Sequence, residues 1–216
     1  MDTGTVSDSP EQEAKQEEVV LKIRSCKDAK YTRKVAGAMS WQLREKGYCR
    51  ARAVKMDAIN TATKAVAIVN QWLASAGLTM SMDPIFTPVE NAKPENPEGT
   101  GEHATAIALM IEDASDLARP GEFLEYRVSG KNDEEGVSKL AGAIAVPIRQ
   151  GKGIRLSCIG PSAVYRAVKA CTVAKGYVYP NGLKAVIVPA WGNLCSEDKD
   201  PISLIKIDFW AVPIDQ

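Results

Sequence analysis

Apolar and polar residues alternate in several short runs along the chain, and this period of two predicts β-strands. The clearest alternation is in the run 203–209. Its inward residues are Ile205, Ile207 and Phe209, and its outward set is Lys206, Asp208 and, just beyond the run, Trp210. Similar runs predict strands at 19–25, 49–54, 79–83 and 105–111, and again at 124–129, 154–159 and 184–188. The strands at 79–83 and 184–188 are expected to stop at Pro84 and Pro189, because proline cannot donate a ladder hydrogen bond.

Between these runs the apolar residues recur at helical spacing, which predicts amphipathic helices. One set is Val35, Met39 and Leu43, and another is Leu140, Ile144 and Ile148. Two further helices carry alanines on their inner faces, so we expect them to lie close against a sheet, with Asp57 and Ser162 as N-caps. Gly37 and Gly142 fall in mid-helix, where glycine costs roughly 0.5–1 kcal/mol relative to alanine. Their position predicts that another backbone passes close by.

The predicted elements occur twice because the sequence repeats itself at an offset of 105 residues. The run Lys-Val-Ala-Gly-Ala-Met at 34–39 returns as Lys-Leu-Ala-Gly-Ala-Ile at 139–144. The offset falls to 98 at the last strand of each copy, so the first copy has the longer preceding loop. One structural unit has therefore been used twice.

Each copy reads β-α-β-α-β-β, a small four-stranded mixed sheet with two helices on one face. The predicted fold class is α+β, as two tandem sandwiches. We expect four segments: a disordered acidic tail at 1–18, copy one at 19–113, a linker at 114–121 and copy two at 122–216. The tail carries six acidic residues against Lys15, a net charge of −5.

Composition is that of an ordinary soluble protein, with 45% hydrophobic and 25% charged residues. No apolar run reaches the roughly 20 residues of a membrane span, and no signal-peptide core is recognisable. The five cysteines form no CxxC pair and read as small core residues of a protein in a reducing, cytoplasmic compartment. We expect no metal and no cofactor. An enzyme is not expected either, because the single histidine, His103, has no nucleophile placed around it by motif and no phosphate-binding glycine loop occurs.

Several motifs resemble the stage V sporulation protein S family. In copy two these are Lys139–Ile144, Ile159-Gly160, Ala167–Ala170 and Ala174–Val178; in copy one they are Val35–Ala38, Thr63–Ile68 and Thr105–Glu112. The resemblance covers nearly all of both copies and implies the Alba-like fold. It also implies a small, non-enzymatic, often dimeric module whose fold is best associated with nucleic-acid binding. Here two fused copies would replace the homodimer and pack as an internal pseudo-dimer.

Charge distribution favours RNA or DNA as the ligand of copy one. The whole chain is neutral, with 27 basic and 27 acidic residues, but residues 22–64 hold twelve Lys or Arg against three acidic residues, a local net charge of +9. Such a patch can bind phosphates by releasing counterions. The candidate nucleic-acid-binding residues are Lys27, Lys30, Lys34, Arg50, Arg52, Lys55 and Lys64, with Arg155, Arg166 and Lys169 as a weaker set in copy two.

An alternative reading is a structural scaffold, with protein partners in a large assembly such as a cytoskeletal or ciliary complex. The loops before the last strands are acidic, with Glu90, Glu95, Glu98 and Glu102 in copy one and Glu197, Asp198 and Asp200 in copy two. Acidic loops repel phosphates, whereas the hairpins of Alba-like DNA binders are basic. Outward Trp41, Trp191 and Trp210 are candidate anchors for a protein interface.

Overall fold

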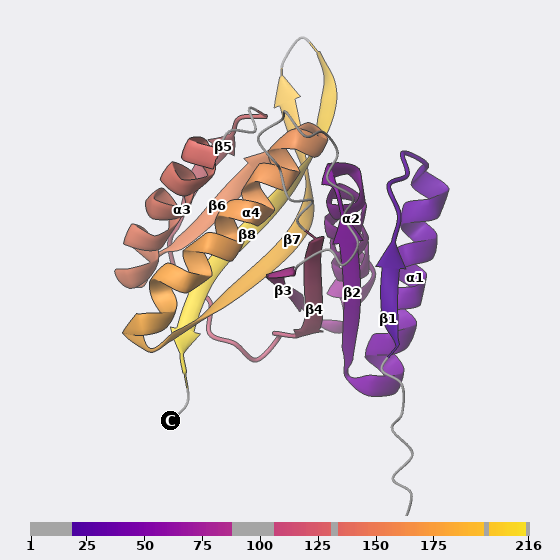
Figure 1. Cartoon of the computed structure of the whole chain (residues 1–216), viewed down its shortest axis with the longest axis horizontal. Helices are drawn as coiled ribbons and strands as arrows, with labels where there is room; N and C mark the ends of the chain where they lie inside the picture. Colours follow the sequence, from indigo (N-terminus) through magenta and orange to yellow (C-terminus); the bar gives the residue numbers. More distant parts are fainter. Residues whose placement is uncertain (1–18, 88–105, 131–133, 197–198, 215–216) are drawn as a thin grey trace, which may run out of the picture.

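The computed structural model describes residues 19–87, 106–130, 134–196 and 199–214. They form two similar halves, each a four-stranded sheet with two helices on one face (Figure 1). The predicted α+β class and the β-α-β-α-β-β order of each copy are confirmed. No helix within the described ranges is long and apolar enough to cross a membrane.

Copy one consists of β1 (Val20–Ile23), α1 (Ala29–Lys46), β2 (Tyr48–Val54), α2 (Met56–Leu73), β3 (Met80–Thr87) and β4 (Ala106–Asp113). Copy two consists of β5 (Phe123–Val128), α3 (Glu134–Arg149), β6 (Gly153–Cys158), α4 (Gly160–Val178), β7 (Leu183–Ser196) and β8 (Lys199–Pro213). Short 3₁₀ turns at Ala74–Ala76 and Tyr179–Asn181 follow α2 and α4. The strand orders are β1-β2-β4-β3 and β5-β6-β8-β7, with only the first pair of each sheet parallel.

Alanines let the second helix of each copy lie close to its sheet. Ala58, Ala62 and Ala65 of α2 are fully buried, as are Ala167 and Ala170 of α4. Larger side chains at these positions would push the helix away from the sheet, so small residues set the spacing of the layers.

Two local expectations are wrong. The third strand of each copy runs on through its proline, Pro84 in β3 and Pro189 in β7. Proline is tolerated there because both strands lie at the edge of their sheets. No backbone crowds the mid-helix glycines: a Cβ atom added to Gly37 or Gly142 would meet nothing within 4 Å.

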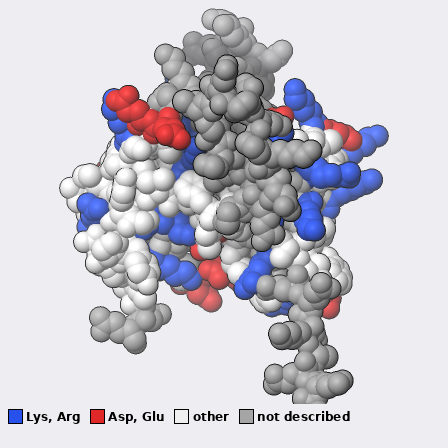
Figure 2. Space-filling model, in the orientation of Figure 1, with Lys and Arg blue, Asp and Glu red and all other residues white. Residues whose placement is uncertain are grey.

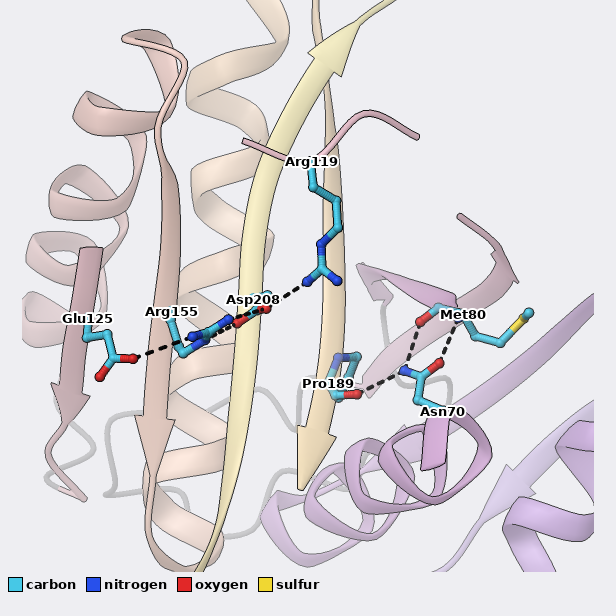
Figure 3. A network of polar contacts seen from close by, with 7 residues as sticks. All are labelled: Asn70, Met80, Arg119, Glu125, Arg155, Pro189 and Asp208. Carbon is cyan, nitrogen blue, oxygen red and sulfur yellow. Dashed lines mark hydrogen bonds and ion pairs between the residues drawn. The ribbon is translucent and has the colours of Figure 1, made fainter. Parts of the chain in front are cut away.

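The copies contact each other through α2 and β3 on one side and α4 and β7 on the other. Asn70 Nδ2 donates a 2.9 Å hydrogen bond to the carbonyl of Pro189 (Figure 3). At the positions 105 residues apart, Lys175 Nζ donates to the carbonyl of Pro84 at 3.2 Å and also pairs with Asp83. The two equivalent contacts run in opposite directions, which is the pattern of a two-fold interface.

Residues 114–121 do more than join the copies. They cross the outer face of the copy-two sheet, where Ala114 is buried and Leu117 packs against the same small cluster. Beneath them lies Trp210, which is 1% exposed, with Arg119 5.0 Å above its ring and Phe123 at its edge. Trp210 leaves the sheet on the outward face, as expected, but its burial within the chain leaves no ring surface to anchor a partner.

Candidate nucleic-acid interface

Two helices of copy one begin at the same edge of their sheet. Because β1 and β2 are parallel, their carboxyl ends meet there, and α1 and α2 follow directly. Lys27 precedes α1, which is capped by Asp28: its carboxylate accepts a 2.8 Å hydrogen bond from the amide of Lys30. We call Lys27, Lys30, Lys34 and Lys55, all exposed, the basic edge of copy one.

Helix α2 starts without a side-chain cap. The predicted caps are wrong: Asp57 and its counterpart Ser162 lie inside the first turn, and neither α2 nor α4 has a side-chain hydrogen bond at its N-cap. The first amide groups of a helix carry partial positive charge, which attracts anions. At the start of α2 the carboxylate of Asp57, in the first turn, offsets this partial charge, so the positive potential of the basic edge comes from its lysines.

Lys55, immediately before α2, has a strained backbone. Its φ of 71° and ψ of 161° fall in a region that is almost confined to glycine. The equivalent residue in copy two is Gly160, with a φ of 81°. Among the described residues, Lys55 alone combines a side chain with a positive φ. Copy one thus keeps a lysine where the geometry suits glycine.

A hollow of about 890 Å³ lies on the helical side of copy one, between α1 and α2 and beside Pro161 and Trp191 of copy two. We call it the intercopy hollow. Lys27, Arg33 and Lys64 line it from copy one, and Trp191 and Pro161 close it from copy two. The ammonium of Lys64 lies 5.9 Å from the centre of the Trp191 ring, a cation–π contact between the copies. Basic and aromatic groups therefore line the same concave surface.

Asn60 contributes a buried polar group to this hollow. The residue is 8% exposed, and its Oδ1 atom has no hydrogen-bond partner among the described residues. Its neighbour Thr61 is satisfied, since its hydroxyl donates to the carbonyl of Asp57 at 2.8 Å and also lies 3.2 Å from the carbonyl of Cys26. An unpaired buried acceptor is costly, roughly 1–3 kcal/mol, so Asn60 is suited to a ligand that supplies a donor.

Arg50 and Arg52 lie on the other side of copy one. They project from β2 away from the helices, while Cys49, Ala51 and Ala53 face the core. The structure therefore separates the predicted site into two surfaces. One is the basic edge with Lys64, and the other is the outer sheet face with the two arginines.

Copy two uses the equivalent arginine differently. Arg155 pairs across the sheet with Glu125 and Asp208, and its guanidinium donates two hydrogen bonds to Asp208 at 2.7 and 2.9 Å (Figure 3). Arg119 also binds this carboxylate, at 2.9 Å. Hydrogen bonding to Asp208 raises the pKa of Arg155. Two carboxylates thus neutralise the charge of this predicted contact residue.

In copy one the cross-strand neighbours of Arg50 are Val20 and Met110. They replace Glu125 and Asp208, so the register places no acidic residue directly opposite Arg50. An open groove of about 570 Å³ along this face is lined by apolar side chains and both arginines.

Of the remaining candidates, Arg166 and Lys169 are half-buried on α4, and Lys169 lies 5.3 Å from the centre of the Tyr165 ring. They are outside the basic edge. Figure 2 shows a group of Lys and Arg on the side of the molecule where β1 and α1 lie (right), and further Lys and Arg on the side of copy two (left).

The buried thiols are chemically inert. Burial raises the pKa of Cys49 and of Cys158 to about 12, and that of Cys171 is raised as well. Since the thiolate is the reactive form, these residues serve as core side chains. Within the described residues no group of three or more His, Cys, Asp or Glu side chains could hold a metal ion.

The model of a protein family described as Stage V sporulation protein S (SpoVS) matches residues 19–114 and, separately, residues 125–209. The chain belongs to the SpoVS family. The match confirms the resemblance and its tandem form, and the two SpoVS domains have the expected Alba-like architecture.

Sequence reasoning did not find the intercopy hollow of the tandem SpoVS chain. The sequence pattern marks Trp191 only as a candidate anchor for a protein interface and gives no role to Asn60. The available signal was a polar residue on an otherwise apolar, alanine-rich helix face. The acidic residues at 90–102 and at 197 and 198 lie outside the described residues, and the side chain of Asp200 does too.

Proposed function

We propose that this SpoVS-family protein is a non-enzymatic nucleic-acid-binding module that contacts RNA or DNA through copy one. The observation that carries the proposal is the local charge of +9 between residues 22 and 64 in a chain with no net charge. The basic edge exposes four lysines near the uncapped start of α2.

The strain at Lys55 supports this interpretation. A backbone in this region costs on the order of 1–3 kcal/mol, and such outliers cluster at functional sites. A lysine at the start of an uncapped helix can bring its ammonium to a phosphate that also meets the helix amides. Glycine, which copy two has at the same place, offers no such charge.

A salt series with a charge-reversed pair of variants tests the proposal. Lys34→Glu is compared with Lys139→Glu, because the two lysines occupy equivalent positions of the repeat and only Lys34 belongs to the basic edge. Binding of the wild-type protein to short RNA and DNA should weaken with salt, by a slope set by the number of phosphates contacted. Lys34→Glu should lower that slope by about one or two, and Lys139→Glu should leave it nearly unchanged.

Equal effects of the two substitutions would mean that the charge of copy one has no special role. Absence of any association near physiological salt would remove the nucleic-acid proposal altogether. Arg50→Glu combined with Arg52→Glu then reports separately whether the outer sheet face contributes.

A structural subunit of a larger protein assembly is the second candidate. Trp41 is 58% exposed on α1 and Trp72 is 49% exposed on α2, and exposed tryptophans are frequent anchors of protein interfaces. Size-exclusion chromatography of cell extract distinguishes this role. A scaffold subunit elutes with a large complex after nuclease treatment, whereas a nucleic-acid binder is released.

A further inference from the structure

We propose that the intercopy hollow receives an unpaired base, so that the protein prefers single-stranded nucleic acid to duplex. This inference rests on the proposed function and names the form of nucleic acid and the place where it is read. The groups that carry it are Trp191, Asn60 and the basic residues around them.

The hollow takes one of its walls from copy two, so its full shape depends on the docking of the copies. Trp191 comes from β7 of copy two, and β7 is tied to α2 of copy one by the hydrogen bond from Asn70 to the carbonyl of Pro189. At the start of the two second helices, the Ser162 hydroxyl contacts the Met56 sulfur at 3.3 Å. A preformed surface of this kind requires little rearrangement on binding, which favours affinity.

The lining matches the parts of a nucleotide. Trp191 is 37% exposed and Trp72 is 49% exposed, so both rings can be reached by a base. Base–aromatic stacking tolerates any sequence, because every base has a π face. Lys27 and Arg33 line the same hollow and can meet the phosphates. Lys64 has a flexible four-carbon stem. When a base displaces the Lys64 ammonium from the ring of Trp191, the ammonium can remain beside the sugar-phosphate backbone of the nucleic acid.

Asn60 explains why an unpaired base is favoured. Its buried Oδ1 lacks a donor, and the bases carry amino and imino N–H groups on their Watson–Crick edges. In a duplex these edges are paired and the bases are stacked on one another. Only a single strand or a splayed loop can offer both a free edge and a free face to the hollow.

The repeat predicts one base-binding site of this kind per chain. The position equivalent to Asn60 is Tyr165, whose ring lies under Lys169, and the position equivalent to Trp191 is Phe86. Copy two therefore replaces the amide acceptor with an aromatic ring. We therefore expect a stoichiometry of one strand per chain. The test strand must be too short to reach a second site.

The experiment compares a fluorescent single-stranded RNA of about eight nucleotides, the same sequence as DNA, and the blunt duplex of each, on the full chain. Single strands should bind more tightly than duplexes at equal salt. Trp191→Ala should weaken single-strand binding roughly 5- to 150-fold, the range of stacking contributions, and leave duplex binding within about two-fold. Trp41→Ala is the matched control, since Trp41 is exposed but does not line the hollow.

Asn60→Leu removes the acceptor and keeps the same branched shape and number of heavy atoms, and we expect it to lower single-strand affinity. Asn60→Asp keeps an acceptor and should retain more of that affinity. Wild-type protein provides an independent measurement, because the half-buried Cys26 lines the hollow. Bound single strand should slow alkylation of Cys26, followed by mass spectrometry of its peptide, and duplex should not.

Equal binding of single strands and duplexes, with no effect of Trp191→Ala and no protection of Cys26, would overturn the inference and leave the proposed function intact. If no nucleic acid binds, both this inference and the proposed function are refuted. Protection by single-stranded RNA but not DNA supports the hollow and assigns it to RNA.

Discussion

The strained backbone of Lys55 makes a prediction about stability that is independent of any ligand. Lys55→Gly places glycine at the position that Gly160 occupies in copy two, and both residues have a positive φ, 71° and 81°. The substitution removes the Cβ atom that causes the strain. It should therefore stabilise the folded protein, because the side chain that is deleted is exposed.

The expected magnitude is the difference of two effects. Relief of strain in this region is worth on the order of 1–3 kcal/mol. Glycine gives the unfolded chain more conformational freedom, which lowers the free energy of unfolding by roughly 0.5–1 kcal/mol. The free energy of unfolding should thus rise by about 1 kcal/mol, which corresponds to a melting temperature roughly 2–4 °C higher for a chain of this size.

Urea denaturation of three variants separates strain from charge. Lys55→Ala loses the ammonium and keeps the Cβ atom, so its stability should stay close to that of wild type. Gly160→Ala introduces the strain in copy two, where a Cβ atom would meet nothing within 4 Å, and should destabilise by about 1 kcal/mol. Should Lys55→Gly unfold at the same urea concentration as Lys55→Ala, the strain argument is refuted. Both Lys55 variants should weaken nucleic-acid binding equally, because both remove the same charge.

Other predictions concern stability. Gly37→Ala should stabilise by roughly 0.5–1 kcal/mol in thermal unfolding, since a Cβ atom meets nothing within 4 Å; destabilisation would show a hidden contact. Asp208→Asn should cost about 2 kcal/mol in urea, because it removes the carboxylate that binds Arg155 and Arg119; the value is moderate because both arginines are partly exposed. Burial raises the pKa of Cys171, so above about pH 9 the unfolded chain loses this proton first and the free energy of unfolding falls with rising pH. Relative to wild type, Cys171→Ala should show a shallower fall between about pH 9 and about pH 11, by up to about 1.4 kcal/mol per pH unit.

The sequence predicted those features of the fold that depend on residues close together within one strand or helix. Alternation along β2 separated Ala51 and Ala53 from Arg50 and Arg52, and the structure places the alanines in the core and the arginines on the outer face. The repeat predicted that both copies share an element order. These properties follow from period and from self-similarity, which are local or pairwise features of the sequence.

Contacts between distant residues were beyond that reasoning. The hydrogen bond from Asn70 to Pro189 spans 119 residues, and nothing in the pattern of α2 indicates its partner. Trp210 alternates like an outward residue, yet the segment 114–121 returns over it and buries it. Whether an outward face meets water or another segment is decided by tertiary packing, which periodicity alone does not encode.

The paired registers of the two sheets show how a chain without net charge can distribute its charges unevenly between two copies. Copy two sets Arg155 between Glu125 and Asp208, so its arginine stabilises the sheet and contributes little positive potential outside. Copy one has the uncharged residues Val20 and Met110 in those two places. Electrostatic potential at a surface depends on the charges within about a Debye length, roughly 8–10 Å at ordinary ionic strength, and not on the total. A duplicated module can therefore divide its roles, one copy supplying stability and one wall of the hollow, the other presenting the cations.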